Sequence, residues 1–241
     1  MAQKKARTPN PPKRVQAPQK RVQAPTRRPT TQASAGDRRK LWIGGGALVA
    51  LVVVAIVLGL VLTGGSSAAA TVKWPQLTGL QTGPPPWNTG IDTAAERLDA
   101  IGLNPLPQEA VTFHIHSHLD VFWNGKKATV PRGVGIEPPD QAGQGGYFLE
   151  LHTHDTRGVI HVEAPSKKNF TLAQFMAAWG VRLTSNCLAS RCGDVKIYVN
   201  GKPFTQDPNK LVLKSHEEIA VVAGKAPKTI PSSYKGFFPG E

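Results

Sequence analysis

The sequence predicts an α+β domain, a mostly antiparallel sheet with one packed helix, preceded by a single transmembrane helix and a disordered basic tail. Three observations lead to this prediction. Residues 41–62 carry no charge, segments that alternate apolar and polar residues recur between positions 111 and 222, and residues 171–180 have helical apolar spacing. The predicted divisions are a tail at 1–40, a membrane segment at 41–63, a linker at 64–90 and a domain at 91–241.

The first 40 residues hold most of the charge imbalance. They contain twelve Lys or Arg and one acid, Asp37, which leaves 17 of the 29 basic and 15 of the 16 acidic residues for the rest of the chain. Val15 and Val22 are the only large apolar residues of this tail after Met1, so it buries too little surface to fold alone. We expect no specific nucleic-acid partner. Anionic lipid headgroups are one partner for the tail, and a topology signal without a specific partner is the other interpretation.

Residues 41–62 predict a helix that crosses the lipid bilayer. At about 1.5 Å per residue they span roughly 33 Å, against about 30 Å for the hydrocarbon core. Residues 38–40 are basic, and the next charge is Lys73. This asymmetry predicts a single-pass protein of the cytoplasmic membrane, with a cytoplasmic N-terminus and an extracytoplasmic C-terminal domain. A signal peptide cleaved near the alanines at 68–70 is the alternative, although the apolar run is longer than is usual for one. A lipoprotein is excluded because no Cys lies nearby.

The next segment has the composition of a spacer. Gly-Ser residues at 64–67 favour flexibility, and Gly-Pro-Pro-Pro at 83–86 favours a stiff extended chain. Trp74 is placed either at the membrane interface or on the domain. Thr93 and Glu96 have the spacing of a capping box, which predicts a short helix before Gly102.

Two hairpins are predicted in the first half of the domain. Residues 111–123 alternate strictly, so that apolar side chains share one face while His114, His116, His118 and Asp120 share the other. Asn-Gly at 124–125 predicts a tight turn, with a return strand at 127–130. Residues 131–146 are predicted as a loop. The second hairpin pairs 147–154 with 159–163 around a turn at 155–158.

The second half of the domain begins with the main helix. Thr171 and Gln174 have capping-box spacing, an apolar stripe follows, and Gly180 ends the helix. Strands at 195–199 and 218–222 complete the sheet. Cys187 and Cys192 are the only cysteines, and outside the cytoplasm they predict a disulfide, with metal ligation by the pair as the alternative.

The histidines suggest the function. Six of the seven lie within residues 114–161. A His-x-His pair on a strand points two imidazoles to one face, roughly 6.6 Å apart along the chain, so that both reach one metal ion. His114 and His118, about 13 Å apart by the same rise, cannot share an ion. The first strand therefore offers one pair plus a spare ligand, or ligands for two ions.

The second hairpin supplies further ligands. A four-residue turn at 155–158 places His152 opposite His161, Glu150 opposite Glu163 and His154 opposite Val159. Facing carboxylates beside facing imidazoles are unfavourable unless a cation lies between them. The pattern is geometrically similar to the zinc site of carbonic anhydrases. The predicted metal ligands are His114, His116, His118, His152, His154, His161 and Glu163. His216 is isolated and is not predicted as a ligand, and a polar sheet face without metal is the alternative for the other six histidines.

Several motifs carry a resemblance to a known family. They lie at 114–125, 130–136, 152–163 and 171–180. Over about residues 95–235 the chain resembles a family of bacterial membrane-anchored, histidine-rich extracytoplasmic proteins. The resemblance implies that location and a shared fold, and it implies no activity.

Three functions follow as hypotheses. The first is an extracytoplasmic domain that binds copper or zinc, because imidazole suits both metals. The second is a zinc-dependent hydrolase, which needs an open metal position and a base such as Glu163 or Asp155. The third is a non-catalytic, pH-responsive envelope module that binds another protein. The sequence has no nucleophile motif, phosphate loop or cofactor fingerprint that favours another enzyme class.

Overall fold

The computed structural model describes residues 68–110, 112–138 and 146–237. The predicted basic tail and transmembrane helix lie outside these ranges. Among the residues that are described, no helix is both long enough and apolar enough to span a membrane.

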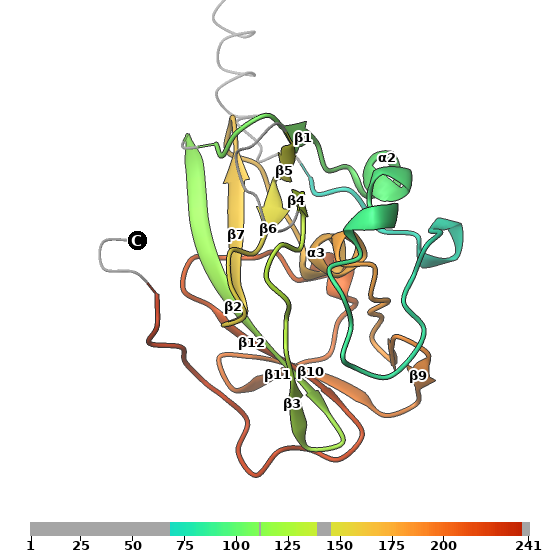
Figure 1. The fold of residues 1–241 in the computed structure, drawn as a ribbon. Helices are drawn as coiled ribbons and strands as arrows, with labels where there is room; N and C mark the ends of the chain where they lie inside the picture. The colour runs from blue at the N-terminus through green and yellow to red at the C-terminus, as the bar shows by residue number, and fades with distance from the viewer. Residues whose placement is uncertain (1–67, 111, 139–145, 238–241) are drawn as a thin grey trace, which may run out of the picture. The chain divides into compact units, whose positions relative to one another are not determined.

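A seven-stranded mixed sheet forms the centre of the domain (Figure 1). Its order is β11–β10–β12–β2–β7–β6, with β3 beside β2. The strands are β2 (Phe113–Trp123), β3 (Lys126–Ala128), β6 (Leu151–His152), β7 (Val159–Ala164), β10 (Val195–Val199), β11 (Lys202–Phe204) and β12 (Glu218–Ala223). Only β2 and β12 pair in parallel within this sheet as described. The prediction of an α+β domain with a mostly antiparallel sheet is therefore confirmed.

Two smaller sheets flank the central one. The first has the order β1–β5–β4, and the second pairs β8 with β9. These strands are β1 (Pro105–Leu106), β4 (Ile136–Glu137), β5 (Tyr147–Leu149), β8 (Cys187–Leu188) and β9 (Arg191–Cys192). The strand predicted at 147–154 is thus divided at Glu150, and its two parts join different sheets. The predicted disulfide between Cys187 and Cys192 is confirmed and closes the β8–β9 hairpin.

Helix α3 (Leu172–Ala178) begins as its sequence predicts. The Thr171 hydroxyl accepts a hydrogen bond from the backbone N–H of Gln174, and the Gln174 side chain accepts one from the Thr171 backbone. Every residue of the helix is buried. Gly180 follows with φ of 74°, a left-handed conformation that glycine adopts without strain.

The capping box predicted at Thr93 does not form. The segment is instead η2 (Ile91–Thr93), η3 (Ala95–Arg97) and the short α2 (Leu98–Ile101). The Thr93 hydroxyl accepts a hydrogen bond from Nη1 of Arg97 at 2.7 Å. The guanidinium of Arg97, fully buried, also donates to the carbonyls of Ala177 and Ala178 at the end of α3. A positive charge at this end complements the partial negative charge of the helix terminus.

The described part of the predicted linker packs on the domain. Val72, Trp74 and Trp87 belong to the main hydrophobic core. The ring of Trp87 lies edge-on to those of Trp123 and Trp179, with centroids 5.9 and 5.5 Å apart. The folded domain therefore begins before the predicted boundary at residue 91, and Trp74 contacts the domain.

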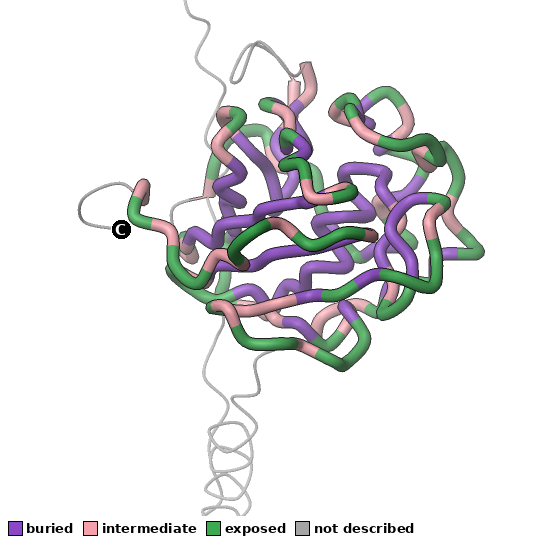
Figure 2. The backbone as a smooth tube through the Cα atoms, turned by 90° about the horizontal axis from the view of Figure 1, so that it is seen from below, coloured by how far each residue is buried: buried purple, intermediate pink, exposed green. Residues whose placement is uncertain are grey.

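Both faces of β2 are buried, which differs from the simple alternation of its sequence. One face packs into the core with α3, and on the other His116, His118 and Asp120 are also buried. Figure 2 shows this burial running through the strands, with exposed residues in the outer loops. Polar residues buried in a sheet require partners, and those partners define the candidate site.

Candidate metal centre

Three neighbouring strands bring the histidines together. In the β2–β7 ladder His116 is paired with His161, and His114 with Glu163. On the other side of β7, His152 is paired with His161. The predicted register of the second hairpin is therefore confirmed. It places His161 between a histidine of β2 and a histidine of β6.

The imidazole nitrogens of β2 and β7 are in close contact. Nε2 of His116 lies 2.9 Å from Nε2 of His114 and 2.9 Å from Nδ1 of His161. On the β6 side, Nε2 of His152 lies 3.1 Å from Nε2 of His154. Nitrogen lone pairs this close repel one another unless a proton or a metal ion lies between them.

The carboxylate of Glu163 occupies the centre of this group. Its Oε1 lies 3.1 Å from Nε2 of His114, 3.5 Å from Nδ1 of His161 and 3.7 Å from Nε2 of His152. This oxygen is buried, and among the described residues its contacts with the imidazoles are ion-pair contacts without hydrogen-bond geometry. The other oxygen, Oε2, accepts a hydrogen bond from the backbone N–H of Ala110 at 3.1 Å. The carboxylate is thus fixed with one oxygen directed at the imidazoles.

These separations match those of ligands around one ion. Metal–nitrogen bonds of about 2.0–2.1 Å in a tetrahedral site place ligand atoms about 3.4 Å apart. Two overlapping groups have all their ligand atoms within 4.8 Å of one another, namely His152, His154, His161 and Glu163, and His114, His116 and His161. We call their six members the histidine cluster. Nδ1 of His161 lies 2.9 Å from Nε2 of His116 in one group and 3.5 Å from Oε1 of Glu163 in the other, and a single nitrogen lone pair binds one ion at a time.

The hydrogen bond of His152 fixes its tautomer. Nδ1 lies 2.8 Å from the carbonyl oxygen of Leu149. A carbonyl only accepts, so Nδ1 carries the hydrogen and Nε2 presents its lone pair to His154 and Glu163. Ligand histidines in metalloproteins are held in this way by a bond from the second ring nitrogen.

Burial keeps the inner imidazoles neutral. It lowers the pKa of His152 well below its ordinary value, and the neighbouring His154 and His161 lower it further. Burial, followed by the nearby His154 and His116, lowers the pKa of His161 to about 2. Burial also raises the pKa of Glu163. Neutral imidazole is the form that binds metal.

The cluster has an inner and an outer part. His116, His152 and His161 are buried, whereas the side chains of His114 and His154 are 36% and 31% exposed. Nε2 of His154 also lies 3.0 Å from Oε1 of Glu109, a residue that no sequence pattern singled out. His114 and His154 are therefore the members of the cluster that a dissolved ion meets first.

The structure separates His118 from the other predicted ligands. Its Nδ1 lies 2.6 Å from Oε2 of Glu218, and its Nε2 donates to the carbonyl oxygen of Arg157 at 2.8 Å. His118, Asp120 and Glu218 form a third group of close ligand atoms. The 2.6 Å contact between Nδ1 of His118 and Oε2 of Glu218 has the length of a charge-assisted hydrogen bond, so we expect a proton rather than a metal ion between these two atoms. Glu218 could not be selected from sequence because β12 reaches β2 by a long-range parallel pairing.

The two carboxylates predicted to oppose each other differ in their partners. The backbone N–H of Glu163 donates to the carbonyl of Glu150, as the predicted register requires. The carboxylate of Glu150 is neutralised by Nζ of Lys168 at 2.6 Å and accepts from the backbone of Asn104. Only Glu163 is directed at the imidazoles. His216 lies outside all three groups of close ligand atoms in the described chain, and its ring packs against Phe237.

Comparison of the chain with protein-family models, with curated proteins and with solved structures gives no match. The arrangement of side chains therefore supplies the argument for function.

Proposed function

We propose that this domain binds a copper or zinc ion through the histidine cluster and acts as a metal-binding module outside the cytoplasm. The buried Oε1 of Glu163 is the observation that carries the proposal, because it lacks a hydrogen-bond partner in the described part of the chain while three imidazole nitrogens lie within 3.7 Å. A divalent cation neutralises that carboxylate and accepts the facing lone pairs. Imidazole with one carboxylate suits copper and zinc.

The same geometry argues against the hydrolase alternative. A catalytic zinc site keeps one position open and has a separate base nearby. Glu163 is itself a member of the ligand group and is buried. Asp155, the other base that the sequence offered, is held by Nε of Arg157 at 2.7 Å. Binding without turnover is therefore the function that these residues support best.

Metal content and thermal stability test the proposal directly. The full chain, purified without a histidine tag, is incubated with copper(II) or zinc and desalted, and bound metal is measured by elemental analysis. We expect retained metal and a raised melting temperature at about pH 7.5. A ligand at a hundredfold excess over its dissociation constant adds about 2.7 kcal/mol to the free energy of unfolding.

Two variants make this test specific. His152→Ala removes a buried ligand and should abolish the metal-dependent rise in melting temperature. His216→Ala changes a histidine outside the cluster and should leave the rise intact. If the native chain retains neither metal and neither shifts its melting curve, the metal site is refuted and a pH-responsive protein-binding module becomes the better account.

The location of the domain is a separate part of the proposal. The uncharged segment at 41–62 and the basic residues before it support a membrane anchor, and the disulfide supports an oxidising compartment. Protease added to intact cells should remove the domain and leave the N-terminal tail. Protection of the domain until the cells are lysed would refute this location.

A further inference from the structure

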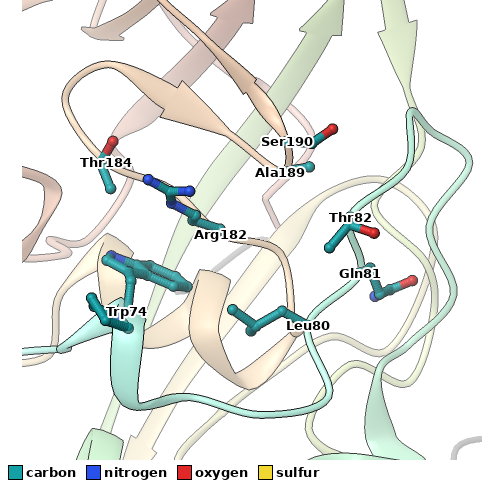
Figure 3. A pocket seen from close by; sticks show the side chains of 9 residues that line it. Trp74, Leu80, Gln81, Thr82, Arg182, Thr184, Ala189 and Ser190 are labelled. Carbon is teal, nitrogen blue, oxygen red and sulfur yellow. The ribbon is translucent and has the colours of Figure 1, made fainter.

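A cavity of about 610 Å³ lies apart from the histidine cluster. Trp74 and Leu80 line it from the N-terminal part of the domain, and Arg182, Thr184 and Ser190 line it from the chain after α3 (Figure 3). None of these residues belongs to a group of metal-ligating atoms. The volume is in the range of about 300–1,000 Å³ that is usual for small-molecule sites.

The walls of this cavity are mainly apolar, with one charge. Trp74, Leu80 and Ala189 supply apolar surface, and Arg182 is the charged residue among those that line it. Figure 3 shows the side chains of Trp74, Leu80 and Arg182 around the same space. An apolar pocket with one cation favours a ligand that has an apolar body and one negative charge.

The guanidinium of Arg182, a half-buried residue, has few acceptors within the described chain. Its Nε is buried and has no hydrogen-bond partner among the residues that the structure describes. Its Nη2 donates to Sγ of Cys187 at 3.5 Å, and sulfur is a weak acceptor. Within the described chain no carboxylate lies within ion-pair distance of Arg182. A carboxylate bound in the cavity would give the guanidinium the charged acceptor that the described chain does not supply.

Thr184 offers a second donor. Its Oγ1 accepts hydrogen bonds from the backbone N–H groups of Asn186 at 3.3 Å and Cys187 at 2.9 Å. The acceptor positions of the oxygen are thus used, and the hydroxyl hydrogen remains available to a ligand.

We propose that this cavity binds a small monocarboxylic acid with an apolar or aromatic body. The carboxylate receives hydrogen bonds from Arg182 and Thr184, and the body packs against Trp74 and Leu80. The planar fork of arginine matches the geometry of a carboxylate. A single arginine balances one negative charge, which favours a monoanion over a phosphate dianion.

The site permits a clean substitution. The carbonyl of Arg182 accepts a hydrogen bond from the backbone of Ala189 at 2.8 Å, and this bond does not depend on the side chain. The disulfide between Cys187 and Cys192 holds the adjoining hairpin. Arg182→Gln should therefore remove the charge while the walls stay in place.

Calorimetric titration of the full chain with 3-phenylpropionate and with its neutral amide tests the proposal. We expect the acid to bind native protein at least about tenfold more tightly than the amide, because a charge-assisted bond replaces a neutral one. Arg182→Gln should lower the affinity for the acid to that for the amide. Arg182→Lys should restore part of the difference in affinity between the two ligands. His216→Ala, outside both the cavity and the histidine cluster, should bind the acid as the native chain does.

Equal binding of acid and amide to the native chain would overturn the proposal. So would absence of acid binding up to about 10 mM, which corresponds to a free energy weaker than about −3 kcal/mol, or unchanged acid binding by a folded Arg182→Gln variant. The acid–amide comparison uses native protein, so it decides the matter even if the variant fails to fold.

Discussion

Nδ1 of His118 lies 2.6 Å from Oε2 of Glu218, and the two residues are partners in the parallel ladder between β2 and β12. Both side chains are buried. The ring of Tyr234 covers the imidazole at a centroid distance of 3.7 Å, nearly parallel to it. This pair therefore joins the two halves of the sheet beneath the C-terminal segment, through a contact as short as a charge-assisted hydrogen bond.

The first prediction concerns this pair. His118→Ala should leave the metal content of the protein unchanged and should lower its stability by about 3–5 kcal/mol, because Glu218 remains buried without its partner. Elemental analysis and urea unfolding measure the two effects. The double variant His118→Ala/Glu218→Gln should recover part of the loss. Loss of bound metal in a folded His118→Ala variant would show that His118 is a ligand after all.

The second prediction compares two buried carboxylates. Glu163→Gln removes a charge whose Oε1 lacks a hydrogen-bond partner, so the metal-free protein should be as stable as the native one or more so. Metal affinity should fall at least about tenfold, which is the usual loss of affinity when a residue that supports a metal site is substituted. Isothermal titration and thermal melting provide the two readouts.

Glu150→Gln is the matched control for Glu163→Gln. Glu150 is equally buried but pairs with Nζ of Lys168 at 2.6 Å. Its substitution should lower stability by about 1–3 kcal/mol and leave the metal-dependent rise in melting temperature unchanged. The same response from both variants would contradict the central position assigned to Glu163.

The third prediction concerns the pH dependence of the metal-free protein. The pKa values of His152 and His161 are lowered by burial and by neighbouring histidines, that of His161 to about 2. Below about pH 6.5 the unfolded chain binds protons at these positions while the folded chain does not. The free energy of unfolding should therefore fall as the pH is lowered, by up to about 1.4 kcal/mol per pH unit for each histidine.

Glu163 changes the free energy of unfolding with pH in the opposite direction to the two histidines. Burial raises its pKa, so the folded state takes up that proton first and gains stability as the pH falls through the raised pKa toward the ordinary value. In urea unfolding between about pH 7.5 and pH 5, the loss of stability from the two histidines should exceed the gain from Glu163. A His161→Asn variant should show a smaller loss. A free energy of unfolding that stays constant over this interval would reject buried neutral imidazoles.

The fourth prediction tests where the domain begins. A fragment of residues 68–241 should unfold cooperatively, whereas a fragment of residues 91–241 should be much less stable, because it lacks Val72, Trp74 and Trp87. Removing one large aromatic residue from a core costs about 3–5 kcal/mol. Circular dichroism melting compares the fragments. Equal melting temperatures would show that the segment before residue 91 is a spacer.

Local rules of sequence predicted much of the fold. The Asn-Gly turn after β2 forms with positive φ at both residues, 51° for Asn124 and 81° for Gly125, as two-residue hairpins require. The four-residue turn at 155–158 was enough to place His152 opposite His161. These predictions succeed because short connections leave few choices of register.

The long-range pairing of strands could not be predicted from the sequence. No local pattern shows that β12 joins β2 in parallel, and this pairing determines that His118 meets Glu218 rather than the other histidines. The composition of residues 64–90 favoured a spacer, because the turn-forming residues of this segment outnumber the apolar residues that pack it against the domain. Alternation along β2 likewise predicted a polar face but could not predict that other segments bury it.

The parallel pairing of β2 with β12 also imposes an order on synthesis. The strands that carry the histidine cluster, β2, β6 and β7, all leave the ribosome before residues 218–223. Until those residues arrive, one edge of β2 from His118 to Trp123 has no strand to complete it. An open edge is a template for pairing with another chain. A nascent or truncated chain that ends before residue 218 would therefore carry every proposed metal ligand while its sheet remained open to intermolecular association.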